Sequence, residues 1–200
     1  MMRVALVDAG GANIGSVRYA LQRLGIDAEL TADAGAIRAA DRVILPGVST
    51  AAQVMARLRE SGLVDTLRTL QQPLLGVCVG MQLLFEHSEE DDTACLGLLP
   101  GRVTRLPDST GVRVPHMGWN TLAPQRESSL TRGIGQGEYA YFVHSYAAPV
   151  TADCLMASEH GIAFAAVVQR GQVAGAQFHP ERSAAVGARL IQNFIETGLA

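Results

Sequence analysis

The residue with the clearest chemical potential is Cys78, which stands in the pattern Gly76-Val77-Cys78-Val79-Gly80. An apolar run at residues 74–77 precedes it, and a helical pattern follows. A tight turn from strand to helix strains its central residue and leaves room only for residues without side chains on either side. The pattern is therefore typical of a nucleophile elbow, which aims the sulfur outward above the carboxyl ends of the strands. The positive end of the following helix favours the thiolate, the form that attacks.

The alternative for Cys78 is a small buried hydrophobe, which is the usual role of a lone free cysteine in an apolar strand. The two glycines and the strand-to-helix position favour the catalytic interpretation enough that the two interpretations have equal weight. Cys95 and Cys154 have no such setting, and we interpret both as structural. Three cysteines without a C-x-x-C pair indicate neither a disulfide scaffold nor a zinc site.

A base and its orienting group are predicted at His179 and Glu181, in Gln177-Phe178-His179-Pro180-Glu181. Residues two apart in an extended segment point to the same side, and Pro180 disfavours a helical conformation before it. Glu181 can then fix the tautomer of His179, whose other nitrogen takes the thiol proton and returns it to a leaving amine. Taken alone, the His179-Pro180-Glu181 segment fits a surface histidine beside a surface glutamate equally well. With the elbow upstream, it becomes a triad hypothesis.

Donors for an oxyanion are predicted from backbone N–H groups at Gly47 and Val48, in the glycine turn after residues 42–45, and at Val79. From spacing alone, an ordinary loop is favoured at Gly47 and Val48. The glycines at residues 10–15 resemble a phosphate loop but lack the Lys-Ser/Thr that follows one, so nucleotide binding there is not expected.

The bulk properties fit one α/β domain over residues 1–200, with 48% hydrophobic and 18% charged residues. A net charge of −3 without a basic block argues against nucleic acid, and no apolar run reaches the roughly 18–20 residues that cross a membrane. The apolar start ends at Asp8, too short for an export signal, so we expect a cytoplasmic protein with reduced thiols. The chain begins Met1-Met2, and either can be the true start. The scattered histidines make no metal pattern, and neither metal nor cofactor is expected.

The elements that position these groups alternate in the first half of the chain. Strands are predicted at residues 3–7, 28–30, 42–45 and 74–77, and helices at 14–24, 51–59, 63–70 and 81–85. The second half has strand-like runs at 103–106, 112–114, 121–122, 138–143, 155–157, 163–169 and 173–178, and a closing helix at 184–194. We therefore predict a parallel central sheet flanked by helices, with an antiparallel β extension.

The segments Gly76-Val77-Cys78-Val79-Gly80-Met81-Gln82 and Gln177-Phe178-His179-Pro180-Glu181 resemble the signature pair of class I, triad-type glutamine amidotransferases. Three others resemble the glutaminase subunits of imidazole glycerol phosphate synthases: Val114-Pro115-His116-Met117-Gly118-Trp119-Asn120, Tyr141-Phe142-Val143-His144-Ser145-Tyr146 and Leu96-Gly97-Leu98-Leu99-Pro100-Gly101. The resemblance runs over nearly the whole chain.

This resemblance implies a flavodoxin-like class I glutaminase domain. Cys78 would attack the glutamine carboxamide and form a glutamyl thioester, His179 would protonate the departing ammonia, and Glu181 would orient His179. The resemblance assigns glutamine binding to Gln82, Glu90, His144 and Ser145, with Glu90 near the α-ammonium group, where a carboxylate makes a charge-assisted contact.

The resemblance also implies a heterodimer. Ammonia would pass to a cyclase subunit of (β/α)8-barrel fold, which makes imidazole glycerol phosphate in histidine biosynthesis. An exposed tryptophan beside polar groups suits an interface centre, although core packing is the alternative for Trp119. The positions that match the family's partner interface are Asn13, His116, Trp119, Asn120, Tyr141 and Arg182.

The chain departs from the family pattern at three places. Ser49 replaces the usual glycine, beside which a peptide flips more easily to form the oxyanion hole. The loop after Asp8 lacks the usual aromatic residue, and Arg182 replaces lysine, which keeps the charge with another geometry. Three alternatives remain open: a stand-alone cysteine amide hydrolase, the glutaminase subunit of another ammonia-using synthase, and a silent binding module. The intact triad residues argue against the last.

Overall fold

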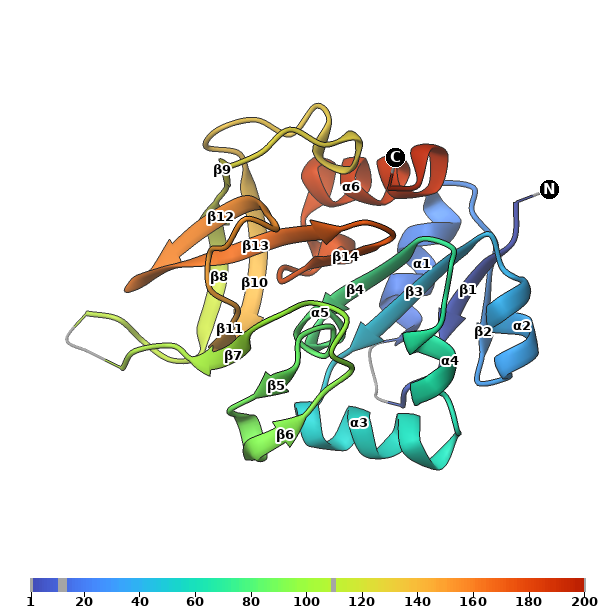
Figure 1. Cartoon of the computed structure of the whole chain (residues 1–200). Coiled ribbons are helices and arrows are strands. Elements are labelled where there is room, and N and C mark those ends of the chain that lie inside the picture. Colours follow the sequence, from blue (N-terminus) through green and yellow to red (C-terminus); the bar gives the residue numbers. More distant parts are fainter. Residues whose placement is uncertain (1, 11–13, 109–110, 200) are drawn as a thin grey trace.

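An eight-stranded mixed sheet forms the centre of the computed structural model, which describes residues 2–10, 14–108 and 111–199. The strand order is β2-β1-β3-β4-β14-β13-β12-β9 (Figure 1). Strands from β2 to β14 run parallel, and β13, β12 and β9 extend the sheet in antiparallel fashion. The bounds are β1 Val4–Val7, β2 Ala28–Thr31, β3 Arg42–Gly47, β4 Leu74–Cys78, β9 Ala123–Pro124, β12 Cys154–His160, β13 Ile162–Arg170 and β14 Val173–Ala176. The predicted fold class is confirmed.

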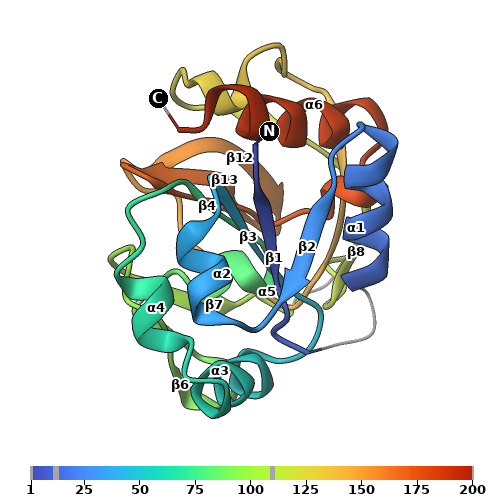
Figure 2. The ribbon, with the colours of Figure 1, turned by 90° about the vertical axis from the view of Figure 1, so that its right-hand side faces the viewer.

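Helices cover both faces of the parallel part, which explains why its inner strands are continuous apolar runs. Every residue of β1 and of β4 is buried. Figure 2 shows α1 on one side of these strands and α2 and α4 on the other. The helices are α1 Ile14–Arg23, α2 Ala34–Ala39, α3 Ala51–Glu60, α4 Val64–Arg68, α5 Val79–Gln82 and α6 Ala184–Thr197, with 3-10 turns η1 Glu90–Asp92, η2 Ser129–Thr131 and η3 Pro180–Arg182.

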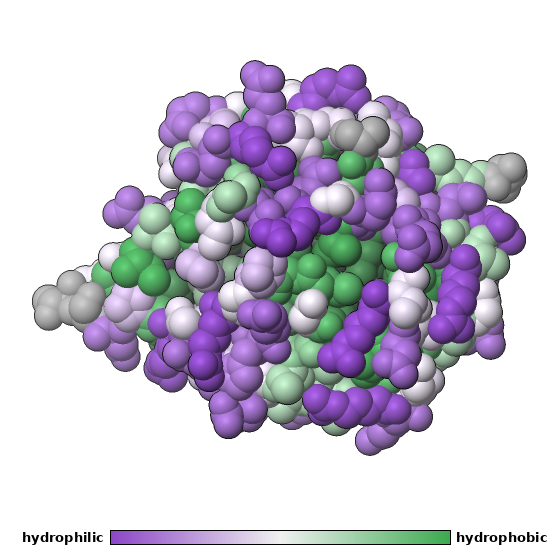
Figure 3. Space-filling view, viewed as in Figure 1, coloured by the Kyte–Doolittle hydropathy of each residue, from purple (hydrophilic) through white to green (hydrophobic). Residues whose placement is uncertain are grey.

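Two smaller sheets lie beside the central one and complete the surroundings of the elbow. The first is a ribbon of β8 His116–Thr121 paired antiparallel with β10 Tyr139–His144. The second has the order β11-β7-β5-β6, formed by β5 His87–Ser88, β6 Thr93–Ala94, β7 Arg102–Arg105 and β11 Tyr146–Ala147. Hydrophilic side chains cover most of the face shown in Figure 3, with apolar ones gathered near its middle. Among the described residues, no helix is both long and apolar enough to cross a membrane.

Some predicted elements are wrong, for physical reasons. Residues 112–114 form no strand beyond an isolated bridge at Val112, because Pro115 has no N–H for a ladder. The strand predicted at 121–122 corresponds to the end of β8. The start of β8 was not predicted, because glycine and asparagine are uncommon in strands. Helix α2 was not expected, because only Ile37 of its six residues is buried. Its one sequence signal is Asp33, which caps the helix by accepting the N–H of Ala36 at 2.7 Å.

Candidate active site

Cys78 lies at the tip of a sharp turn between β4 and α5, as the elbow pattern predicts. Its backbone has φ 55° and ψ −114°, a left-handed conformation that is strained for a residue with a side chain. A Cβ atom on Gly76 would lie 2.5 Å from the carbonyl oxygen of Gly80, and one on Gly80 would overlap the carbonyl oxygen of Leu45. The requirement for glycine on both sides of Cys78 is therefore confirmed.

The helix after the elbow begins and ends earlier than predicted. It covers Val79–Gln82 rather than residues 81–85 and is a single turn of four residues. A macrodipole grows with the number of aligned peptides, and one turn carries little of it. The predicted stabilisation of a Cys78 thiolate by a helix dipole loses most of its basis, and the neighbouring imidazole becomes the main charged partner.

His179 lies between Cys78 and Glu181. Its Nδ1–H donates to Glu181 Oε1 at 2.8 Å, and its ring also hydrogen-bonds to the Cys78 side chain. The Glu181 carboxylate is almost fully buried. Only His179 is extended, whereas Glu181 belongs to the 3-10 turn η3 that Pro180 starts. The predicted extended arrangement of the pair is therefore wrong, and the turn brings the carboxylate back to the ring.

The main chain around His179 is held from two sides. Its backbone N–H donates to the Tyr141 carbonyl at 2.9 Å, and Ser183 Oγ donates to the His179 carbonyl at 2.7 Å. The Cys78 thiol lies 3.8 Å from the Val143 carbonyl, two residues further along β10. Strand β10 therefore fixes both the base and the nucleophile.

The contacts of His179 favour its protonated form. Burial alone lowers the pKa of the ring, but the hydrogen bonds to Cys78 and Glu181 and the negative charges of both outweigh it and raise the pKa from 6.5 to about 10. An imidazolium beside a thiolate is the arrangement in which a cysteine attacks without first losing a proton. The group can then give its proton to a leaving amine.

We expect His179 to remain protonated well above pH 7 and to have a lower pKa in Cys78→Ala, because the contact with Cys78 contributes to the raised pKa while the contact with Glu181 remains. A nitrogen-15 NMR titration of both proteins measures this. The raised pKa stabilises the folded state fully below pH 6.5, and this contribution is lost as the pH rises towards about 10. A His179 signal that titrates near pH 6.5 in the parent protein would contradict the ion pair.

A cleft of about 400 Å³ opens over Cys78. Most predicted site residues meet there: Val48, Cys78, Val79, Gln82, Glu90, His144, Ser145, His179 and Arg182. Gly47 lies directly beside them, paired with Cys78 in the register of β3 and β4. Ser49, Pro115, Val143 and Tyr146 also line the cleft. Pro115, Val143 and Tyr146 were not predicted as site residues, because nothing in their types or spacing indicates chemistry. Ser49 was singled out only as a departure from the family pattern beside the oxyanion turn.

Glu90 is held in the cleft by its neighbours. Its Oε2 accepts the N–H of Ala51, the first residue of α3, at 2.8 Å, and Thr93 Oγ1 donates to its carbonyl at 2.7 Å. Burial raises the pKa of the half-buried carboxyl group despite the Ala51 hydrogen bond. A cationic ligand group would offset this desolvation.

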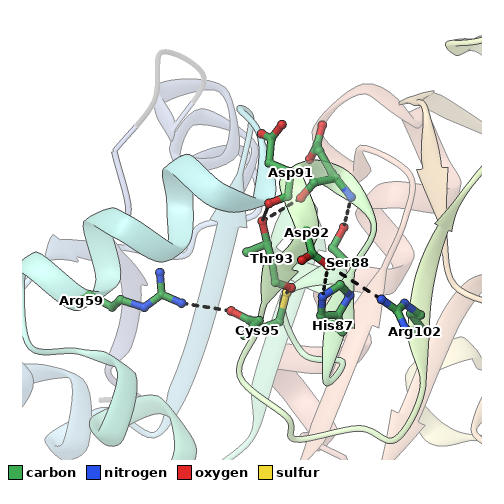
Figure 4. A network of polar contacts seen from close by, with 10 residues as sticks. Arg59, His87, Ser88, Asp91, Asp92, Thr93, Cys95 and Arg102 are labelled. Atoms are coloured by element: carbon green, nitrogen blue, oxygen red, sulfur yellow. Dashed lines mark hydrogen bonds and ion pairs between the residues drawn. The ribbon is translucent and has the colours of Figure 1, made fainter.

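The turn that carries Glu90 is itself strained and braced. Asp91 and Asp92 both have positive φ, 53° and 47°. Asp92 Oδ1 accepts a hydrogen bond from His87 Nε2 at 2.9 Å and lies 3.9 Å from Arg102 Nη2 (Figure 4). Strained non-glycine residues cluster at functional sites, so these two are a structural sign of the site that sequence reasoning missed.

Gln82 is buried and its amide is fixed. Its Nε2 donates to the Tyr146 carbonyl at 2.8 Å and to Gln177 Oε1 at 3.0 Å. Both amide hydrogens are thus used, which leaves its oxygen to receive donors from the cleft.

The residues predicted at a partner interface divide between surface and interior. Trp119 is 53% exposed on the β8–β10 ribbon, its ring centroid 5.8 Å from that of Tyr141, and the Arg182 guanidinium stacks over Tyr141 at 4.3 Å. Core packing is therefore excluded for Trp119. Asn120 is partly exposed, but His116 is only 4% exposed, so its ring lies beneath this surface. Asn13 lies outside the described residues.

The described residues contain no group of three or more His, Cys, Asp or Glu side chains that could hold a metal ion.

The family model for glutamine amidotransferase class-I matches residues 5–197. The chain is 62% identical over 196 residues to "Imidazole glycerol phosphate synthase subunit HisH" of Xanthomonas euvesicatoria pv. vesicatoria, covering 98% of each chain. It is 59% identical to the protein of the same name from Xylella fastidiosa strain Temecula1, over the full length of both. Among solved structures, one described as a glutamine amidotransferase aligns with a TM-score of 0.74 at 23% identity, covering 96% of this chain and 97% of the other, which supports the fold.

Proposed function

Because the chain belongs to the class I glutamine amidotransferases, we propose that it is the glutaminase subunit of an imidazole glycerol phosphate synthase in histidine biosynthesis. It hydrolyses glutamine to glutamate and ammonia. The observation that supports this most is the meeting of Cys78, His179 and Glu181 in one cleft of a chain so similar to relatives of that name.

The reaction follows from the chemistry of the triad. The Cys78 sulfur attacks the carboxamide carbon of glutamine, and an S–C bond forms while the carbonyl oxygen becomes an oxyanion. His179 gives its proton to the amide nitrogen, and the C–N bond breaks. Ammonia departs, and a glutamyl thioester remains on Cys78. His179 then takes a proton from water, whose hydroxide attacks the thioester and releases glutamate and the thiolate. Glu181 keeps the ring in the required tautomer throughout.

The oxyanion is stabilised by the backbone N–H groups of Val48 and Val79, with Gly47 allowing the close approach of the two segments. Both valines line the cleft beside Cys78, and a Cβ on Gly47 would lie 2.8 Å from the Val79 side chain. Donors placed at the developing charge stabilise the transition state more than the substrate. Ser49 modifies how readily this turn rearranges.

Glutamine is held by the other side of the cleft. The Glu90 carboxylate binds the α-ammonium group, which supplies the cation that its desolvated position favours. Gln82 and the main chain at His144 and Ser145 complete the binding site. The carboxamide then points towards Cys78.

The partner is a cyclase subunit of (β/α)8-barrel fold, which receives the ammonia in a heterodimer. The exposed Trp119, stacked with Tyr141 and Arg182, makes a suitable anchor because interface centres favour these residue types. Asn120 and His116 contribute at and below the same surface, and Asn13, which lies outside the described residues, is assigned to the interface by the family resemblance alone. Residues 1–200 act as one domain. We place the protein in the cytoplasm, where its three free thiols stay reduced.

A glutaminase assay tests the proposal. The chain is incubated with glutamine alone, and then with a cyclase subunit and its nucleotide ligand, while glutamate release is measured. Stimulation by cyclase and ligand together supports the synthase subunit. Equal rates with and without them would indicate a stand-alone hydrolase, and no release in either case would indicate a silent binding module.

Trp119→Ala tests the partner surface in the same assay. Loss of a central interface tryptophan typically costs about 2–4 kcal/mol, so we expect the affinity for the cyclase to fall by about 30-fold or more. The rate at saturating cyclase should change less. Leu30→Ala is the control, because Leu30 is also an exposed apolar side chain but lies on the edge strand β2, far along the central sheet from β12, the strand that contacts β8.

A further inference from the structure

Two buried histidines lie in register across the ribbon and form a hydrogen bond with each other. His116 of β8 pairs with His144 of β10, and His116 Nδ1 lies 2.9 Å from His144 Nε2. One nitrogen must donate and the other accept. The direction of this hydrogen bond is set by what each ring contacts on its other side.

On the side of His116 that faces away from His144, the direction of the hydrogen bonds is set by Asn120. Its Oδ1 accepts the N–H of Thr121 at 2.8 Å, so its Nδ2 is the atom that faces both the Glu159 carbonyl, at 2.8 Å, and His116 Nε2, at 3.2 Å. An amide nitrogen can only donate. His116 Nε2 therefore accepts, and the proton of His116 is on Nδ1, from which it is donated to His144.

On the side of His144 that faces away from His116, the direction of the hydrogen bonds is set independently by Tyr146. Its carbonyl can only accept, and His144 Nδ1 lies 2.8 Å from it. The proton of His144 is therefore on Nδ1, and its Nε2 accepts from His116. Both ends thus require the same two tautomers. The same Tyr146 carbonyl accepts the Gln82 amide at 2.8 Å, so the row of hydrogen bonds ends on a residue of the glutamine cleft.

The surroundings keep both rings neutral, as the row requires. Burial, together with the nearby His160, lowers the pKa of His116 to about 4, and burial is also the main cause that lowers the pKa of His144 to about 3. A proton on His144 Nε2 would turn two N–H groups towards each other and break the row. The two rings are thus a fixed, directional connection rather than a proton pathway.

We propose that this row, the histidine relay of Asn120, His116, His144 and the Tyr146 carbonyl, fixes the wall of the cleft that receives glutamine. His116 is then a positioning residue: it touches no substrate but orients His144, and through the shared carbonyl it orients Gln82. The proposal rests on the proposed function, since it assigns the cleft to glutamine. The proposal extends that function, because it gives His116, which is buried below the partner surface, a role in substrate binding.

Three variants of the chain, assayed in complex with the cyclase, test the relay. His116→Phe keeps a stacked ring but removes both hydrogen bonds. We expect the KM for glutamine to rise about tenfold, equivalent to about 1.4 kcal/mol, the scale of one buried hydrogen bond. A change in ground-state binding leaves kcat within about twofold. His116→Asn, whose amide can donate from near the position of Nδ1, should recover most of the affinity.

His160→Phe is the matched control. His160 stacks on His116 with ring centroids 4.1 Å apart and binds the Arg113 carbonyl at 2.7 Å, but it lies outside the relay. It should leave KM unchanged. If His116→Phe has the same KM as His160→Phe, or if His116→Asn recovers nothing, the relay has no role in positioning.

Nitrogen-15 NMR of the unsubstituted chain gives a second test that does not depend on a variant that folds. Both His116 and His144 should be neutral with the proton on Nδ1 at pH 7. A proton on Nε2 of either ring overturns the relay. This result is separate from the proposed function, because the tautomers can be read even if the chain hydrolyses no glutamine.

Discussion

Replacing Cys78 by alanine is expected to lower the rate of glutamine hydrolysis by at least about 10⁴-fold, because no other group can form the thioester. Cys78 is the thiol that hydrogen-bonds to His179 in the cleft. Removing a nucleophile disables the whole triad, since His179 and Glu181 act through it. The measurement is glutamate release by the complex with its cyclase and nucleotide ligand.

The other two cysteines are matched controls for this substitution. Cys95 and Cys154 are buried, and burial raises the pKa of each thiol to about 11, so neither is a nucleophile at neutral pH. Cys95→Ala and Cys154→Ala should therefore keep the parental rate per folded molecule. Cys78→Ala should also keep its affinity for the cyclase, because the elbow lies within the cleft rather than on the ribbon surface. Parental glutaminase activity in Cys78→Ala would remove the nucleophile assignment.

The elbow was predictable because most of its requirements are local. The strain at Cys78 and the crowding of Gly76 against Gly80 arise within five consecutive residues, so the sequence pattern carries this part of the geometry. The crowding of Gly80 comes from Leu45 of β3 and is not visible in the pattern. The parallel sheet was predictable for a similar reason, since its inner strands, such as β1 and β4, are continuous apolar runs buried on both faces. Boundaries shifted by one or two residues, as at β3, which continues through Pro46 and Gly47.

The glutamine side of the cleft was not predictable from local pattern. Glu90 sits in a short polar turn, and only its long-range hydrogen bond to Ala51 and the strain at its neighbours mark it as special. Resemblance to the family, rather than periodicity, was what indicated it. Gln82 is similar, since its amide is oriented by Tyr146 and Gln177, both distant in the chain.

The contact between His116 and His144 could not be derived from the sequence. Its neighbours in the chain, Met117 and Trp119, are exposed, and alternation on a strand does place it on the opposite face. Alternation does not say what that face contacts. Only the register of β8 with β10 brings His116 against His144, and register across 28 residues is a property of the tertiary structure.

The substitution expected to damage the fold most is Gly80→Ala. A Cβ at this position would overlap the carbonyl oxygen of Leu45 and lie 2.9 Å from the Leu45 carbonyl carbon. Leu45 belongs to β3, in the middle of the central sheet, where it is paired with Gly76 of β4. The obstacle is therefore backbone held in a ladder on both sides, which cannot move as a flexible side chain can. We expect a loss of more than about 4 kcal/mol in the free energy of unfolding, a large part of the roughly 5–15 kcal/mol of a typical domain.

Gly15→Ala is the matched control, because it makes the same chemical change where space is available. Gly15 lies in α1, and an added Cβ would meet only Tyr19 at 3.9 Å, an ordinary contact. Alanine is the better helix former, so this variant should be as stable as the parent or up to about 1 kcal/mol more stable. Urea unfolding of both variants measures the difference. If Gly80→Ala unfolds at the same urea concentration as Gly15→Ala, β3 and the elbow are not packed as closely as described, and the geometry that aims Cys78 into the cleft would need another explanation.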